Sequence, residues 1–126
     1  MKSVLVDTSV WVDHFKGHNA ELVVLLERDL VLMHPWVIGE IACGTPPRRE
    51  QTLTDLEGLQ PAIQASSQEV LAFIAREKLY GLGCGWVDFQ LLASTLLTQG
   101  SELWTLDKRL SGLAERFGAA HRPLTH

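Results

Sequence analysis

Short apolar runs alternate with longer amphipathic stretches along the chain. Runs rich in apolar and β-branched residues predict buried strands at 3–6, 30–33 and 102–105, and weaker ones at 61–63 and 119–121. Apolar residues at three- and four-residue spacing, bounded by caps, glycine or proline, predict helices at 10–17, 21–28, 35–44, 46–56, 67–80, 86–98 and 107–117. Strands separated by helices favour an α/β fold, in which helices cover both faces of a central, mostly parallel sheet of four to five strands.

Four acidic residues lie near the predicted binding edge of this sheet. Ligands of parallel sheets bind at the carboxyl ends of the strands. Asp7 directly follows the first strand, and Asp107 lies two residues beyond Thr105, at the start of the last helix. Glu40 lies within the helix after the second strand, and Asp88 lies in the first turn of the helix that begins near residue 86. The four are therefore candidates for one common site.

Apolar neighbours in the sequence predict that these four carboxylates are buried. Buried carboxylates close together repel one another unless a cation lies between them, and ligation by oxygen alone suits Mg²⁺ or Mn²⁺. Two such ions can promote an in-line displacement at phosphorus without a protein nucleophile. Thr8, Ser9 and Thr105 are then candidates to hold metal-bound waters or to orient the carboxylates.

Taken singly, each acid also has a structural interpretation. Asp7 could serve as a helix N-cap, and Asp88 and Asp107 lie in first helical turns, where the helix dipole favours acids. Glu40 is the hardest to explain in this way, because it interrupts an apolar helix. The order of the four acids and their placement after strands favour a metal site.

These residues resemble the motifs of PIN-domain ribonucleases, and most closely those of the toxin component of VapBC toxin–antitoxin modules. The matching segments are Val6-Asp7-Thr8-Ser9-Val10-Trp11, the lone Glu40 after a proline-opened helix, Val87-Asp88-Phe89-Gln90-Leu91-Leu92-Ala93-Ser94 and Leu103-Trp104-Thr105-Leu106-Asp107-Lys108-Arg109-Leu110. The resemblance covers the chain from end to end.

The resemblance implies a PIN-like three-layer fold and a Mg²⁺- or Mn²⁺-dependent endoribonuclease, usually a homodimer, that is blocked by a small cognate antitoxin. By motif match the catalytic and metal-binding quartet would be Asp7, Glu40, Asp88 and Asp107, with Thr105 as its hydroxyl companion. The chain departs from the family pattern at Leu106, where a polar or basic residue is common, and at Leu110, where an aromatic residue is common. These two departures leave the RNA contacts near the last helix open.

Composition and charge fit a single domain spanning residues 1–126. An apolar content of 46% excludes disorder, and a net charge of -4 argues against a simple nucleic-acid coat protein, although metal ions could mediate contact with RNA. Lys108 and Arg109 are the candidates for contacts to RNA phosphates. Asp7 interrupts the first apolar stretch too early for a signal peptide, and no apolar run reaches the ~18 residues of a membrane span, so we expect a cytoplasmic protein with no membrane partner.

The tryptophans and cysteines are expected to serve mainly in packing. Trp104 falls in a predicted strand, whereas Trp11 and Trp36 could line a dimer or antitoxin surface, because Trp is enriched at interfaces. Packing is favoured over base stacking at each of the tryptophans. Cys43 and Cys84 are too few for a disulfide scaffold and are expected to pack as small apolar groups.

Two other functions compete with RNA cleavage. A catalytically inactive PIN-like module could bind RNA or a partner, but it would have no reason to keep four costly buried acids. A Mg²⁺-binding phospho-receiver domain has a similar size, but it needs paired acids after the first strand, where Asp7 stands alone. A phosphotransferase of the haloacid dehalogenase type needs a second Asp two residues beyond the first, where this chain has Ser9.

Overall fold

The computed structural model describes residues 2–123, so both ends of the predicted domain lie outside the description. The strands are β1 (Ser3–Val6), β2 (Val31–Met33), β3 (Gln60–Pro61) and β4 (Ser101–Trp104). The helices are α1 (Thr8–Gly17), α2 (Ala20–Glu27), α3 (Pro35–Ala42), α4 (Arg49–Glu57), α5 (Ser67–Arg76), α6 (Trp86–Leu97) and α7 (Lys108–Arg116).

The strands form one four-stranded parallel sheet in the order β3-β2-β1-β4. The chain moves from β1 through β2 to β3 in one direction and then crosses back to place β4 on the other side of β1. Ligands of such sheets bind where the strand order reverses, which here is the edge between the carboxyl ends of β1 and β4. The predicted strand at 119–121 is reduced to one parallel bridge between Leu103 and Ala120.

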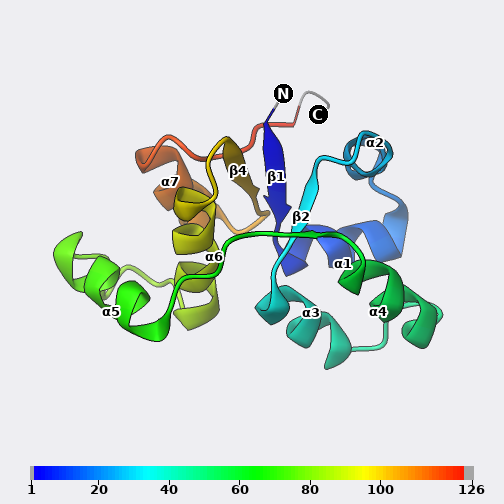
Figure 1. The fold of residues 1–126 in the computed structure, drawn as a ribbon, viewed down its shortest axis with the longest axis horizontal. Helices are drawn as coiled ribbons and strands as arrows, with labels where there is room; N and C mark the ends of the chain where they lie inside the picture. The colour runs from blue at the N-terminus through cyan, green and yellow to red at the C-terminus, as the bar shows by residue number, and fades with distance from the viewer. Residues whose placement is uncertain (1, 124–126) are drawn as a thin grey trace.

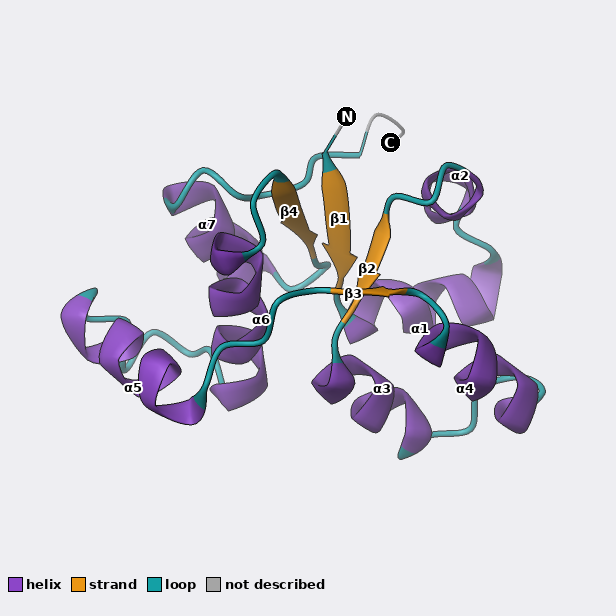
Figure 2. Cartoon of the chain, viewed as in Figure 1, coloured by secondary structure: helices purple, strands orange, loops and turns teal. Residues whose placement is uncertain are grey.

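The helices flank the sheet in two groups. Helices α1 to α4 lie on one side of it, and α5, α6 and α7 lie on the other (Figure 1). Figure 2 shows the short strands held between these two groups, with β3 crossing in front at the edge of the sheet. The α/β fold with a parallel sheet and helices on both sides, predicted from the sequence, is confirmed.

The core is built from the strands and the helix faces that cover them. Leu5 in β1 and Leu103 in β4 are buried, as are Leu91 and Leu92 in α6. Trp104 is also buried, as its place in a strand predicts. Within residues 2–123, no helix has the length and apolar content that a membrane crossing requires.

Several sequence predictions are wrong in detail. The helix predicted at 67–80 ends at Arg76, because Lys78 adopts a left-handed conformation (φ 55°) and the Leu79 amide turns back to donate to the Ile74 carbonyl oxygen. The helix predicted at 46–56 begins later, at Arg49, since Arg48 before it is also left-handed (φ 47°).

Two side-chain placements narrow or correct the sequence analysis. Trp11, one of two tryptophans that could line a dimer or antitoxin surface, is 3% exposed, because α1 turns it into the core beside Val10. Cys43, expected to pack as a small apolar group, is exposed, because it caps the carboxyl end of α3.

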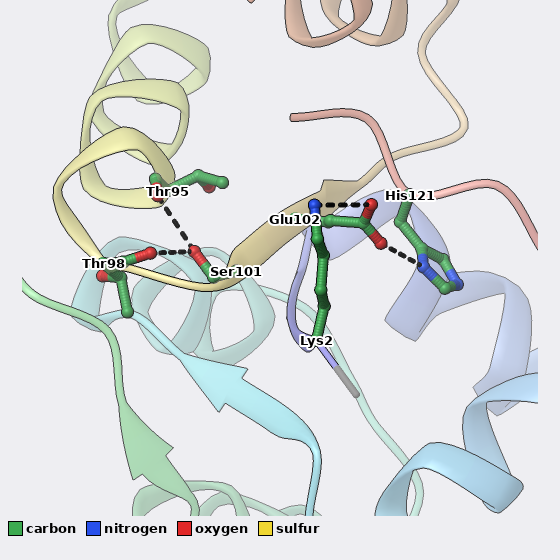
Figure 3. A network of polar contacts seen from close by, with 6 residues as sticks. All are labelled: Lys2, Thr95, Thr98, Ser101, Glu102 and His121. Atoms are coloured by element: carbon green, nitrogen blue, oxygen red, sulfur yellow. Dashed lines mark hydrogen bonds and ion pairs between the residues drawn. The ribbon is translucent and has the colours of Figure 1, made fainter. Parts of the chain in front are cut away.

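A separate polar network fixes β4 at its amino end (Figure 3). The Ser101 hydroxyl lies 2.9 Å from the Thr95 carbonyl oxygen and 2.6 Å from that of Thr98, which ties the start of β4 to the end of α6. Next along the strand, the Glu102 carboxylate lies 3.8 Å from Lys2 Nζ and 3.3 Å from His121 Nδ1. These contacts hold β4 beside β1, with the carboxyl ends of both strands at the other edge of the sheet.

Candidate active site

Asp7 lies at the centre of a hydrogen-bond network at the strand reversal. It follows β1 directly and is the N-cap of α1, where its Oδ1 accepts from the Thr8 amide at 2.8 Å. Its Oδ2 accepts from the Ser9 hydroxyl at 2.8 Å and from the Thr105 hydroxyl at 2.7 Å. The side chain is 7% exposed, so both oxygens are held in fixed directions in a largely buried position.

Thr105 links Asp7 to the start of α7. Its hydroxyl donates to Asp7 and accepts from the Asp107 amide at 3.0 Å. Ser9 makes a second link, because its hydroxyl accepts from the Leu106 amide at 3.0 Å. Asp107 itself is the N-cap of α7, and its Oδ1 accepts from the Leu110 amide at 3.0 Å. The loop after β4 is therefore bound to the loop after β1 through side-chain hydroxyls.

Glu40 is connected to the same network from α3. The Thr8 hydroxyl donates to Glu40 Oε1 at 2.6 Å, across 32 residues of sequence. Because the Thr8 amide also donates to Asp7, this one residue contacts both carboxylates. The contact holds the otherwise exposed Glu40 carboxylate beside the network.

Asp88 is connected to two of the other acids by the effect of their charges on its pKa. Burial raises the pKa of its carboxyl, and the charges of Asp7 and Asp107 raise it further, while a hydrogen bond from the Gly85 amide to Oδ2 at 2.9 Å opposes the shift. Asp7 and Asp107 therefore each lie near enough to Asp88 to disfavour its charged form. The structure thus links Glu40 and Asp107 to Asp7 through Thr8 and Thr105, and it places Asp88 within electrostatic reach of Asp7 and Asp107.

The expectation that all four acids are buried is wrong. Asp7 is buried and Asp88 is half-buried, whereas Glu40 and Asp107 are exposed. Ile41 is buried next to Glu40, but neighbouring residues on a helix point in different directions, so an apolar neighbour does not bury the acid. Asp107 is exposed because it lies in the loop that opens α7.

The donor set fits a hydrated, hard dication. Within residues 2–123, no group of three or more acidic, histidine or cysteine side chains is arranged to hold a metal ion. Mg²⁺, however, usually keeps several waters and takes one or two carboxylates directly. All of these acids offer oxygen donors, and the repulsion of the Asp88 carboxylate by Asp7 and Asp107 is the feature that a divalent cation would relieve.

Burial of Asp88, together with this repulsion, predicts that its carboxylate lowers the stability of the metal-free protein. Because the folded-state pKa of Asp88 is raised, the folded chain binds its proton more tightly than the unfolded chain does. Stability contributed by this group therefore falls as the pH rises above the ordinary value of 3.8, and the loss is complete above the folded-state pKa. In EDTA at pH 7, Asp88→Asn is expected to unfold at a higher temperature than the unsubstituted protein, and the difference should shrink as the pH falls towards 4.

Thermal unfolding followed by circular dichroism over a pH series measures this difference. Asp13→Asn is the matched control, because Asp13 lies on the exposed face of α1 outside the acidic cluster. A stabilisation by Asp88→Asn that does not change with pH, or a loss of stability at pH 7, contradicts the prediction.

Two neighbours of the acids, Cys84 and Gly83, were not predicted from the sequence, whereas Arg109 was. Cys84 is half-buried beside them: burial raises the pKa of its thiol, the charges of Asp88 and Asp107 raise it further, and Arg109 opposes them. Arg109 Nη1 lies 3.5 Å from the Gly83 carbonyl oxygen, and a Cβ on Gly83 would lie 2.6 Å from that nitrogen. Gly83 is also left-handed (φ 92°), so the glycine-rich loop before α6 is the sequence signal for this close approach.

Comparisons with known proteins agree with this arrangement. The model of the PIN domain family matches residues 4–116, which include all four acids. The chain is 42% identical over 117 residues to Ribonuclease VapC32 of Mycobacterium tuberculosis, in strain CDC 1551 / Oshkosh and in strain ATCC 25618 / H37Rv. Each alignment covers 93% of this chain and 94% of the relative. The parallel sheet has this acidic cluster at the point where its strand order reverses, and the family model matches most of the length of the chain. These findings show that the chain belongs to the PIN domain family.

Proposed function

We propose that this protein is a divalent-metal-dependent endoribonuclease that hydrolyses RNA phosphodiester bonds and acts as the toxin of a type II toxin–antitoxin pair. The observation that carries the proposal is the acidic cluster at the strand reversal, where Asp7 is fixed by three donors and Asp88 is influenced by two other carboxylates. The similarity to relatives named as ribonucleases supports RNA as the substrate.

Asp7, Glu40, Asp88 and Asp107 would hold Mg²⁺ or Mn²⁺. Bound there, the ion would supply the positive charge that neutralises the phosphate and lowers the pKa of water. Thr8, Ser9 and Thr105 would keep the carboxylate oxygens aimed at it, because their hydroxyls donate to Glu40 and Asp7.

Lys108 and Arg109 would contact the RNA backbone. Both are exposed in the first turn of α7, directly after Asp107. Arg109 lies near enough to Cys84 to lower the pKa of its thiol, so the guanidinium is beside the acidic cluster. Its charge would offset the repulsion between the acids and an approaching phosphate group.

The expected protein partners are a second copy of the chain and a small antitoxin, both in the cytoplasm. The resemblance to VapBC toxins supports both partners. An antitoxin segment that places a basic side chain against the acids would block the site, because its charge replaces that of the metal through charge-assisted hydrogen bonds.

The proposed activity is tested with purified protein and a mixed pool of cellular RNA. We expect cleavage with added Mg²⁺ or Mn²⁺ and no cleavage in EDTA, with activity restored when excess metal is returned. Analysis of the RNA by denaturing electrophoresis measures the result.

Two controls are needed to interpret the assay. Circular dichroism in EDTA verifies that loss of activity is not loss of fold. An equal amount of double-stranded DNA tests whether RNA is the substrate. Binding of RNA without cutting under every metal condition would favour an inactive RNA-binding module, and transfer of phosphate from acetyl phosphate to an Asp would favour a receiver domain.

A further inference from the structure

An apolar hollow lies directly beside the acidic cluster. Helix α3 presents Trp36, Gly39, Glu40 and Cys43 on one face, since residues three, four and seven apart share a face of a helix. These residues, Pro35 and Val87 of α6 line an open hollow of about 410 Å³. Glu40 belongs both to this hollow and to the acidic cluster, so the hollow is continuous with the candidate active site.

Trp36 is the exposed aromatic side chain of this hollow. It is 44% exposed, whereas Trp11 and Trp104 are each 3% exposed. Packing in the core therefore does not explain why a tryptophan stands at this position. The first turn of α3, which carries Trp36, is fixed by the His34 cap and by Pro35. A rigid helix turn that presents an indole ring to solvent provides a platform for a flat ligand.

Gly39 keeps the surface of α3 flat next to this indole. Glycine inside a helix is destabilising relative to alanine, and it usually needs a packing reason. Here a Cβ would meet no atom within 4 Å, so no contact within the described chain requires glycine. The missing side chain leaves open space between Trp36 and Cys43, in which a ligand can approach the helix backbone.

The charge around the hollow selects the kind of ligand. Glu40 lines the hollow, so the hollow carries a negative charge. An anionic phosphate would be repelled there, whereas an uncharged, flat, apolar surface would be accepted. Within an RNA strand whose phosphate lies at the acids, the group that meets these requirements is a base next to the scissile bond.

We propose that Trp36 and Gly39 form a stacking subsite for one RNA base beside the cleaved phosphodiester, an inference that rests on the proposed ribonuclease activity. The base lies against the indole ring and the bare backbone at Gly39, in the hollow that Val87 also lines. Because the lining offers mainly apolar surface, the subsite selects by stacking strength and favours purines over pyrimidines.

The test uses short synthetic RNAs that span a cut site mapped with the unsubstituted protein. In one series, each base near the cut is replaced in turn by an abasic site, and kcat and KM are measured for every oligonucleotide. Trp36→Ala removes the platform, Trp36→Phe keeps an aromatic ring, and Gly39→Leu fills the hollow with a residue that favours a helix. Tyr80→Ala is the control, because it removes an aromatic residue that is 65% exposed outside the site.

We expect Trp36→Ala and Gly39→Leu to raise KM about tenfold with little change in kcat, as the loss of one base stack predicts. Trp36→Phe should remain close to the unsubstituted protein, and Tyr80→Ala should match it. One abasic position should raise KM about tenfold for the unsubstituted protein but add no further increase in Trp36→Ala, because the two changes remove the same contact.

The possible failures are distinguishable. If the unsubstituted protein cuts RNA but no abasic position is coupled to Trp36, the stacking subsite is refuted and the nuclease remains. If Trp36→Ala weakens binding of the antitoxin and leaves the KM for RNA unchanged, the hollow is a protein-binding site and the proposal is also refuted. If no RNA is cut under any metal condition, the ribonuclease proposal fails and the subsite fails with it.

Discussion

Replacing Asp7 by Asn is expected to reduce RNA cleavage at least a hundredfold while leaving the protein folded. The substitution keeps the shape of the side chain and an oxygen that can accept from the Thr8 amide. It removes the negative charge at the centre of the network, where a bound metal would supply several kcal/mol of transition-state stabilisation, and each 1.36 kcal/mol is a factor of ten in rate. The Ser9 and Thr105 hydroxyls can rotate to accept from the new amide group, which limits the loss of stability.

The same substitution has an effect that is independent of the RNA assay. Asp7 raises the pKa of Asp88, so Asp7→Asn should lower that pKa, measured by NMR titration of the Asp88 carboxyl without divalent ions. Asp13→Asn is again the control, because it changes a carboxylate to an amide on the same helix outside the cluster. Cleavage that persists unchanged in Asp7→Asn would refute the proposed site, whatever the titration shows.

Replacing Thr105 by Val is expected to impair both stability and activity. Thr105 is 8% exposed, and its hydroxyl both donates to Asp7 and accepts from the Asp107 amide. Valine has the same shape but can neither donate nor accept a hydrogen bond, so we expect the free energy of unfolding to fall by about 1–3 kcal/mol. Activity should fall about 10- to 100-fold, as is typical when a group that orients metal ligands is lost.

Two matched variants separate positioning from simple loss of packing. Thr105→Ser restores the hydroxyl and should recover most of the activity. Thr95→Val removes another buried hydroxyl, one that donates to the Leu91 carbonyl oxygen within α6, and should affect stability without affecting cleavage. The concentration of Mn²⁺ needed for half-maximal activity should rise in Thr105→Val alone, and an unchanged value would contradict the positioning role.

Much of the fold could be predicted from the sequence because its strands are short apolar runs with clear boundaries. Ser3–Val6 is predicted without error, since Asp7 ends the run and caps the next helix. The helix ends were harder to predict. Lys78 and Arg48 adopt left-handed conformations that glycine usually occupies, so no residue type in the sequence marks those turns.

The sequence predicts which acids could share a site, but it does not predict how deeply each acid is buried. Strand ends place Asp7 and Asp107 at one edge of the sheet, which requires no knowledge of packing. The exposure of Glu40 depends on which face of α3 meets the core, and the link from Thr8 to Glu40 joins residues 32 positions apart. Likewise, the hollow beside Trp36 is lined by residues of α3 and by Val87 of α6, and local periodicity does not predict which residues of two helices line a common hollow.

The ties between Asp7 and the segment after β4 have a consequence for synthesis of the protein on the ribosome. A nascent chain that has emerged as far as the end of α6 already contains Asp7, Glu40 and Asp88, but it lacks Thr105 and Asp107. Its β1 also lacks the neighbouring strand β4, with which it pairs along its full length. The network around Asp7 can therefore be completed only after the segment that contains Thr105 and Asp107 has emerged, late in translation.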